Sequence, residues 1–120
     1  MPISYAIDAA RQVVRIRLWG EVTREELDAN SLRLSSDPQF RPDLPYICDA
    51  RDLSVPPAID DVVRAAYRSV FAAGTRRAIV AGSDVIYGLA RLFAGRSGSV
   101  GDGLQIFRNM DEAERWLGVQ

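Results

Sequence analysis

The stretch "LPYICDARDLS", residues 44–54, decides which fold this sequence predicts. Its apolar first half has the length and composition of a buried β-strand, which we expect over residues 45–49. Its second half places Asp49, Arg51 and Asp52 directly after the apolar run. A buried strand that ends in charge is typical of a parallel sheet, because ligands and partners meet such a sheet beyond the carboxyl ends of its strands.

A second buried strand is expected over residues 77–82, "RAIVAG", where it follows an amphipathic helical pattern. Two strands that are separated by a helix pair in parallel through a right-handed crossover. Parallel pairing brings the carboxyl ends of both strands to one edge, so we expect Asp49 and Ser83 to lie close together there.

The remaining elements follow from periodicity and from helix start and stop signals. Residues 3–7 and 12–20 alternate and predict an antiparallel hairpin, whose arginine-bearing face we expect to lie in water. Helices are expected over residues 23–36, 56–74, 85–93 and 109–118, and a last strand over 104–107. Residues 1–120 are thus predicted to form one α/β domain of order β-β-α-β-α-β-α-β-α, with a single mixed sheet of about five strands and helices mainly on one face.

Composition excludes several classes of function. The 120 residues contain no histidine, and all 15 basic residues are arginine, which removes His-based triads, Schiff-base lysines and Walker A loops. The net charge is −1, and the arginines are spread along the chain, so no basic stripe for nucleic acid is present. Cys48 is the one cysteine, and no apolar run approaches the roughly 20 residues that span a bilayer. We expect a cytoplasmic protein without a membrane span, a cofactor or a metal.

Three segments carry a family resemblance: "GEVTREEL" at residues 20–27, "FRPDLPYICDARDL" at 40–53 and "RRAIVAGSDVIYGLARLF" at 76–93. With the element order, they resemble the STAS domains of sulphate transporters and anti-sigma factor antagonists. The sporulation-antagonist-like branch, which is similar in shape to CRAL-TRIO lipid-binding domains, is the most similar. The resemblance covers nearly the whole chain. It implies a bacterial protein-interaction module whose partner is a regulatory kinase or an anti-sigma-like protein.

The sequence departs from the regulatory STAS pattern at one place. Regulatory members carry a phosphorylated serine or threonine at the start of the helix that follows the aspartate-bearing loop. Here residues 55–60 read "VPPAID" and contain no hydroxyl, and Ser54 lies too early, ahead of two prolines. Of the regulatory STAS pattern, the resemblance therefore implies only the partner-binding rim.

The candidate rim contains the polar residues that follow the two buried strands. These partner- or ligand-binding candidates are Asp49, Arg51, Asp52, Ser54, Ser83, Asp84 and Tyr87. A local interpretation stays open: Asp49 accepts backbone N–H bonds, Arg51 pairs with Asp52, and Ser83 with Asp84 caps a helix. Asp49 and Asp52 lack the further ligands of a metal site. The glycine-rich residues 95–103 follow a helix, the reverse of a phosphate-binding loop, and are expected to be a linker.

The segment "VIYGLARLF", residues 85–93, is apolar nearly all the way round. Such a helix either lies in the core or forms an interface, and Tyr87, Gly88, Leu92 and Phe93 are candidates for a dimer or apolar contact.

Two functions of the chain remain open. One is a non-enzymatic interaction module, regulatory or scaffolding and homodimeric. The other, implied by the lipid-binding resemblance, is a carrier of a small apolar molecule. A catalytic function ranks third, since the sequence lacks histidine and lysine and shows no catalytic motif.

Overall fold

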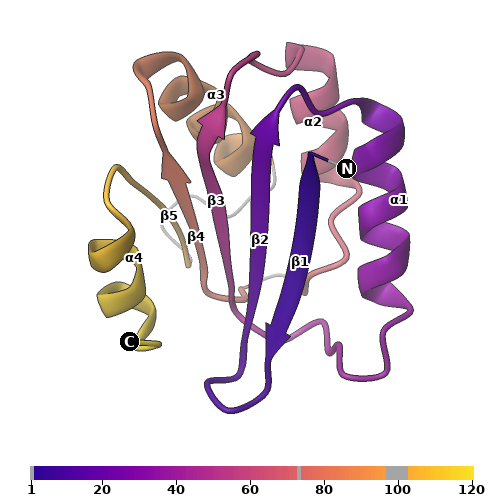
Figure 1. Cartoon of the computed structure of the whole chain (residues 1–120), viewed down its shortest axis with the longest axis vertical. Helices are drawn as coiled ribbons and strands as arrows, with labels where there is room; N and C mark the ends of the chain where they lie inside the picture. Colours follow the sequence, from indigo (N-terminus) through magenta and orange to yellow (C-terminus); the bar gives the residue numbers. More distant parts are fainter. Residues whose placement is uncertain (1, 73, 97–102) are drawn as a thin grey trace.

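A computed structural model describes residues 2–72, 74–96 and 103–120, and these form one five-stranded sheet with helices on both sides (Figure 1). The strands lie in chain order across the sheet. Only β1 and β2 are antiparallel, while β3, β4 and β5 each pair in parallel with the preceding strand. The predicted element order is confirmed, with the bounds β1 Ile3–Asp8, β2 Val13–Gly20, α1 Arg24–Ser35, β3 Tyr46–Leu53, α2 Ile59–Tyr67, β4 Arg77–Ala81, α3 Asp84–Arg96, β5 Leu104–Phe107 and α4 Met110–Leu117.

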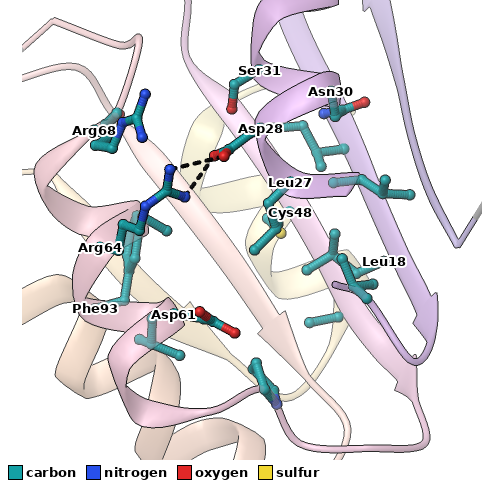
Figure 2. A pocket seen from close by; sticks show the side chains of 18 of the residues that line it. Leu18, Leu27, Asp28, Asn30, Ser31, Cys48, Asp61, Arg64, Arg68 and Phe93 are labelled. Atoms are coloured by element: carbon teal, nitrogen blue, oxygen red, sulfur yellow. Dashed lines mark hydrogen bonds and ion pairs between the residues drawn. The ribbon is translucent and has the colours of Figure 1, made fainter. Parts of the chain in front are cut away.

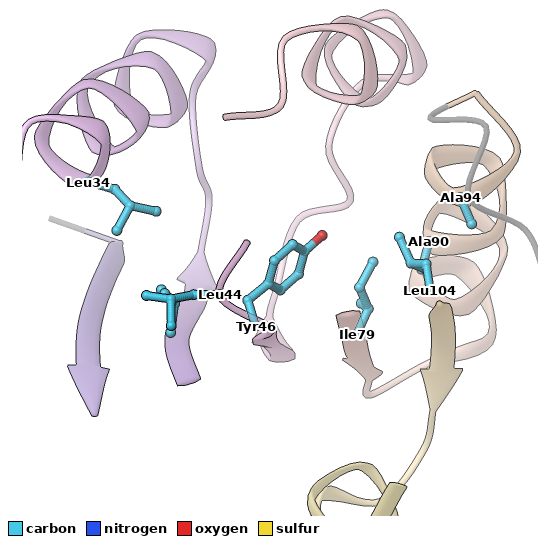
Figure 3. Packing of buried hydrophobic residues seen from close by; sticks show 8 residues of the cluster. Leu34, Leu44, Tyr46, Ile79, Ala90, Ala94 and Leu104 are labelled. Carbon is cyan, nitrogen blue, oxygen red and sulfur yellow. The ribbon is translucent and has the colours of Figure 1, made fainter. Parts of the chain in front are cut away.

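The main core lies between the sheet and the helices α1 and α3 (Figure 3). Tyr46 and Ile79 project from the central strands toward Leu34 of α1 and Ala90 of α3. Alternate residues of each strand reach this side, because successive side chains of a strand point to opposite faces. The helix α2 packs against α3 on the same side.

The opposite face of the sheet is covered by α4, which corrects the expectation that the arginine-bearing face of β2 lies in water. Val13 is completely buried with Ala113 of α4, and Arg15 forms an ion pair of 2.7 Å with Glu114. The amphipathic pattern of β2 does not show which helix will cross that face. The prediction of helices mainly on one face still holds, since α4 is the exception.

Helix termini follow the predicted caps. Thr23 and Glu26 form a reciprocal capping box at the start of α1, as their spacing predicts. Asn109 accepts a hydrogen bond from the backbone of Glu112 and begins α4. Gly118 ends α4 with φ 72°, a left-handed conformation that glycine adopts without a steric penalty.

The helix α2 is shorter than predicted, because it ends at Tyr67 rather than near residue 74. Ile59 and Tyr67, the first and last residues of α2, are 61% and 69% exposed although both are large and apolar. The chain leaves the helix early so that Phe71 can pack on Phe40 and Tyr46, with ring centroids 5.4 and 4.5 Å apart. Tertiary packing of one aromatic ring thus overrides the helical periodicity.

β3 is longer than the predicted strand over residues 45–49. It continues to Leu53 because β2 pairs with it beyond the end of β4. Arg17 is opposite Asp49, whereas Trp19 is opposite Asp52, so β3 contains one extra residue, a β-bulge. Asp49 therefore lies inside a strand, and the expectation that the strand stops at Asp49 is wrong. Parallel pairing of residues 46–50 of β3 with β4 is confirmed.

The glycine-rich residues 95–103 and the expected lack of a membrane span are the remaining sequence expectations about the fold. Of the predicted glycine-rich linker, Gly95 and Arg96 belong to α3, and residues 97–102 lie outside the described residues. In the described part of the chain, no helix is both long and apolar enough to cross a membrane.

Candidate functional site

The charged residues of β3 are held in ion pairs beside the bulge. Asp49 accepts two hydrogen bonds of 2.9 Å from the guanidinium of Arg51 and one of 3.1 Å from its backbone N–H. Asp52 pairs instead with Arg17 of the neighbouring strand, at 3.1 Å. The local interpretation was right that Asp49 binds a nearby backbone N–H and wrong about Arg51, whose partner is Asp49 and not Asp52.

The pairing of Asp49 with Arg51 fixes the charge of that carboxylate. Hydrogen bonds from Arg51 lower the pKa of Asp49, and they outweigh the opposing effect of its partial burial. Asp49 is therefore ionised at neutral pH. Within the part of the chain that the structure describes, no group of three or more His, Cys, Asp or Glu residues could hold a metal ion.

Residues around the start of α3 form a second polar group. The Ser83 hydroxyl accepts a hydrogen bond of 3.2 Å from the backbone of Ile86, so Ser83 caps the helix, as the local interpretation predicted. The exposed Asp84 carboxylate accepts a bond of 2.7 Å from Arg108, whose guanidinium also lies 4.5 Å from the ring centroid of Tyr87. Arg108 was missed by the sequence reasoning, since it follows β5 and meets Asp84 only in the folded chain.

A close backbone contact brings the two polar groups together. A Cβ atom at Gly82 would lie 2.5 Å from the carbonyl oxygen of Arg51, which is too close for any side chain. The backbone at Gly82, in the turn after β4, therefore packs directly against the backbone of Arg51 in β3. We define the rim as the surface at this edge formed by the half-buried Tyr87 and the exposed residues Arg17, Arg51, Asp52, Ser54, Asp84 and Arg108.

The side chain of Ser54 is exposed on the rim, and its backbone is held in place. Its backbone N–H donates to the carbonyl of Gly20 at 3.0 Å, which holds the segment after β3 against the end of β2. The side chains of Ser54 and Val55 are exposed, and α2 begins only at Ile59. The rim therefore combines paired charges with an exposed segment at Ser54, whose backbone is held against the end of β2.

The four candidates for a dimer or apolar contact occupy different environments on α3. Phe93 packs against the main core, and Tyr87 packs against the smaller cluster of Ala50, Ala81 and Ile86. Leu92 is half-buried, whereas Gly88 is exposed and a Cβ atom there would meet nothing within 4 Å. The helix thus has a buried side in the core and an exposed side that carries Gly88.

A cavity of about 420 Å³ lies on the α1 and α2 side of the sheet (Figure 2). The sheet contributes Leu18 and Cys48, and the helices contribute Leu27, Ala65 and Phe93. A volume of this size is within the range of small-molecule sites. Its walls are mostly apolar, and its charged lining residues are Arg24, Asp28, Asp61, Arg64 and Arg68.

Two ion pairs join the helices α1 and α2 beside the cavity. Arg64 donates hydrogen bonds of 2.7 and 2.8 Å to the two carboxylate oxygens of Asp28, as Figure 2 shows. Arg24 donates one of 2.8 Å to Asp61. The guanidinium of Arg68, one helical turn beyond Arg64, has no hydrogen-bond or ion-pair partner among residues 2–72, 74–96 and 103–120, although it lies close enough to Asp28 to lower the pKa of that carboxyl.

Sequence reasoning missed this cavity. The signal available in the sequence is the small size of several side chains on the two helices, such as Ser31 on α1 and Ala65 on α2. Short side chains leave space between a helix and a sheet that larger residues would fill.

Cys48 lies on the floor of the cavity and is half-buried. Its apolar surroundings, with a smaller contribution from Asp49, raise the pKa of the thiol to about 12. The thiol packs against the main core on one side and borders the cavity on the other.

Comparison with known proteins identifies the fold. No protein-family model matches the chain, and no curated protein matches it significantly. A solved structure of an uncharacterized DUF3478-family protein from Shewanella loihica PV-4 superimposes with a TM-score of 0.64 at 17% identity, covering 96% of this chain and 93% of that one. That protein is described as having a SpoIIAA-like fold. This chain has the same fold. SpoIIAA is the STAS-type anti-sigma factor antagonist fold, so the resemblance inferred from the sequence is confirmed at the level of the fold.

Proposed function

We propose that the chain is a non-enzymatic protein-interaction module, regulatory or scaffolding in role, that binds its partner at the rim. The observation that carries the proposal is the SpoIIAA-like fold along 96% of the chain. The partner class is a regulatory kinase or an anti-sigma-like protein, acting in the cytoplasm. The lack of histidine and lysine supports a binding role over a catalytic one.

The structure of the rim supports binding of a partner to a preformed surface. The charges of Arg51 and Asp52 on the rim are each paired within the chain, so a partner would recognise a preformed pattern of both signs. The turn at Gly82 and the backbone bond of Ser54 fix the positions of the two segments. A fixed surface loses little conformational entropy when a partner binds.

Affinity capture from the native cell tests this proposal. The bait is the full chain, and the comparison is Ser54→Arg, which places a long charged side chain on the rim at an exposed position. The matched control is Ala9→Arg, at an exposed position in the hairpin turn at the other end of β2. A partner retained by the wild type and by Ala9→Arg but lost with Ser54→Arg supports the proposal, whereas equal retention by all three chains contradicts it.

A homodimer through α3 is part of the same proposal. The exposed side of α3 carries Val85, which is 57% exposed, together with Gly88 and Arg91. An exposed apolar residue beside a glycine allows a second chain to approach closely. Light scattering of the wild type and of Val85→Asp tests the dimer, and a wild-type chain that stays monomeric at tens of micromolar would contradict it.

A second candidate function is a carrier of a small apolar molecule. The similarity to a SpoIIAA-like fold does not favour it, and its support is the apolar cavity between α1, α2 and the sheet. Native mass spectrometry of gently purified protein tests this function, because a retained ligand adds a discrete mass. Spectra of the empty chain alone, repeated over preparations, would count against it.

A further inference from the structure

The geometry points to an alkyl monocarboxylate as the ligand of the cavity, with its tail against the sheet and its carboxylate at Arg68, an inference that rests on the second candidate function. The floor and walls carry aliphatic and aromatic side chains such as Leu18, Leu89 and Phe93. A ligand body that fits these walls has no polar groups of its own, since each would lose hydrogen bonds to water without replacement.

The charges at the cavity determine the sign of the ligand head group. Its charged lining residues are three arginines and two aspartates, which leaves one positive charge in excess. Asp28 and Asp61 each accept hydrogen bonds from an arginine, so their charges are matched. The excess positive charge therefore resides on Arg68, and it favours a single negative charge on the ligand.

The position of Arg68 suits a head group that stays near water. Its side chain is exposed at the end of α2, on the same side as the Asp28–Arg64 pair (Figure 2). A guanidinium donates two parallel hydrogen bonds to a carboxylate, which fixes both the position and the orientation of the head group. Arg64 cannot serve in this way, because both of its terminal nitrogens already donate to Asp28.

A pair of probes that differ only in the head group tests the inference. The probes are dodecanoate and dodecanol, each titrated below its aggregation limit into the full chain, with affinity measured by calorimetry. Changes in the backbone amide NMR signals of Cys48 and Leu89, which line the cavity, verify where each probe binds. Arg68→Ala is the test variant, and Arg68→Lys keeps the charge without the paired donors.

Arg115→Ala is the matched control, since Arg115 is an exposed arginine on α4, on the other face of the sheet. We expect Arg68→Ala to weaken dodecanoate binding by about three- to tenfold, with a smaller loss for Arg68→Lys and none for Arg115→Ala. Dodecanol binding should be the same in all four chains. This comparison separates the head-group contact from any general change in the fold.

The outcomes distinguish the inference from the function on which it rests. Equal effects of Arg68→Ala on both probes, or no effect on either, would overturn the role of Arg68 and leave the carrier function standing. Failure of both probes to shift the Cys48 and Leu89 signals would overturn the inference and the carrier function together. Neither result would bear on partner binding at the rim.

Discussion

Asp28 of α1 and Arg64 of α2 are joined beside the cavity by two hydrogen bonds of 2.7 and 2.8 Å, although they lie 36 positions apart in the chain. Together with the pair of Arg24 and Asp61, they connect the two helices that border the cavity on its open side. The two ion pairs thus hold α1 and α2 together at the border of the cavity.

The titration of Asp28 tests this contact. Hydrogen bonds from Arg64 lower the pKa of Asp28 below its ordinary value of 3.8. The contact is therefore intact above pH 3.8 and is lost as the pH falls through the lowered pKa. Carboxyl NMR titration should show this shift in the wild type and a return toward 3.8 in Arg64→Ala. An unchanged Asp28 titration in that variant would contradict the contact, and Arg115→Ala serves as the control.

The reactivity of Cys48 tests the environment of the cavity floor. Burial raises its pKa from 9.0 to about 12, so at pH 8 the thiolate fraction is about a thousandfold lower than for an ordinary cysteine. Alkylation by iodoacetamide should be slowed by a similar factor in the folded chain and recover in denaturant. Rapid alkylation of the folded chain at pH 8 would show that the thiol is open to water.

Alanine substitution of Gly82 at the rim and of Gly88 in α3 should change the free energy of unfolding in opposite directions. Gly82→Ala forces a Cβ atom against the Arg51 backbone and should destabilise the fold by about 1–3 kcal/mol. Gly88→Ala adds a methyl group in open space within a helix and should stabilise the fold by about 0.5–1 kcal/mol. Urea unfolding measures both, and equal effects would contradict the close contact at Gly82.

The sheet was predictable from the sequence because strand patterning and crossover rules depend on local features. Residues 45–49 and 77–82 show their burial directly in their composition, and the helix between them makes the pairing parallel. The length of β3 was not predictable. It depends on pairing of Asp52 with Trp19 of β2, which lies much earlier in the chain, across a bulge that no single segment encodes.

The candidate site was only partly predictable for a similar reason. The sequence identified Ser83 as a helix cap and the hydrogen bond of Asp49 to a nearby backbone N–H, because both contacts are local. The expected meeting of Asp49 and Ser83 at one edge was wrong, since Asp49 lies opposite Val80 inside the sheet. The sequence did not identify Arg108, Asp28 or Arg64 as partners of distant residues, because ion pairs between elements depend on how helices pack. A cavity is still harder to predict, since it is a volume that no side chain fills.

Binding of the partner at the rim is the central claim, and the affinity of a captured partner for three purified chains measures it most directly. We predict that Ser54→Arg weakens binding at least about tenfold, while the wild type and Ala9→Arg bind with equal affinity. Equal affinity of all three chains for that partner would show that the rim is not the binding surface.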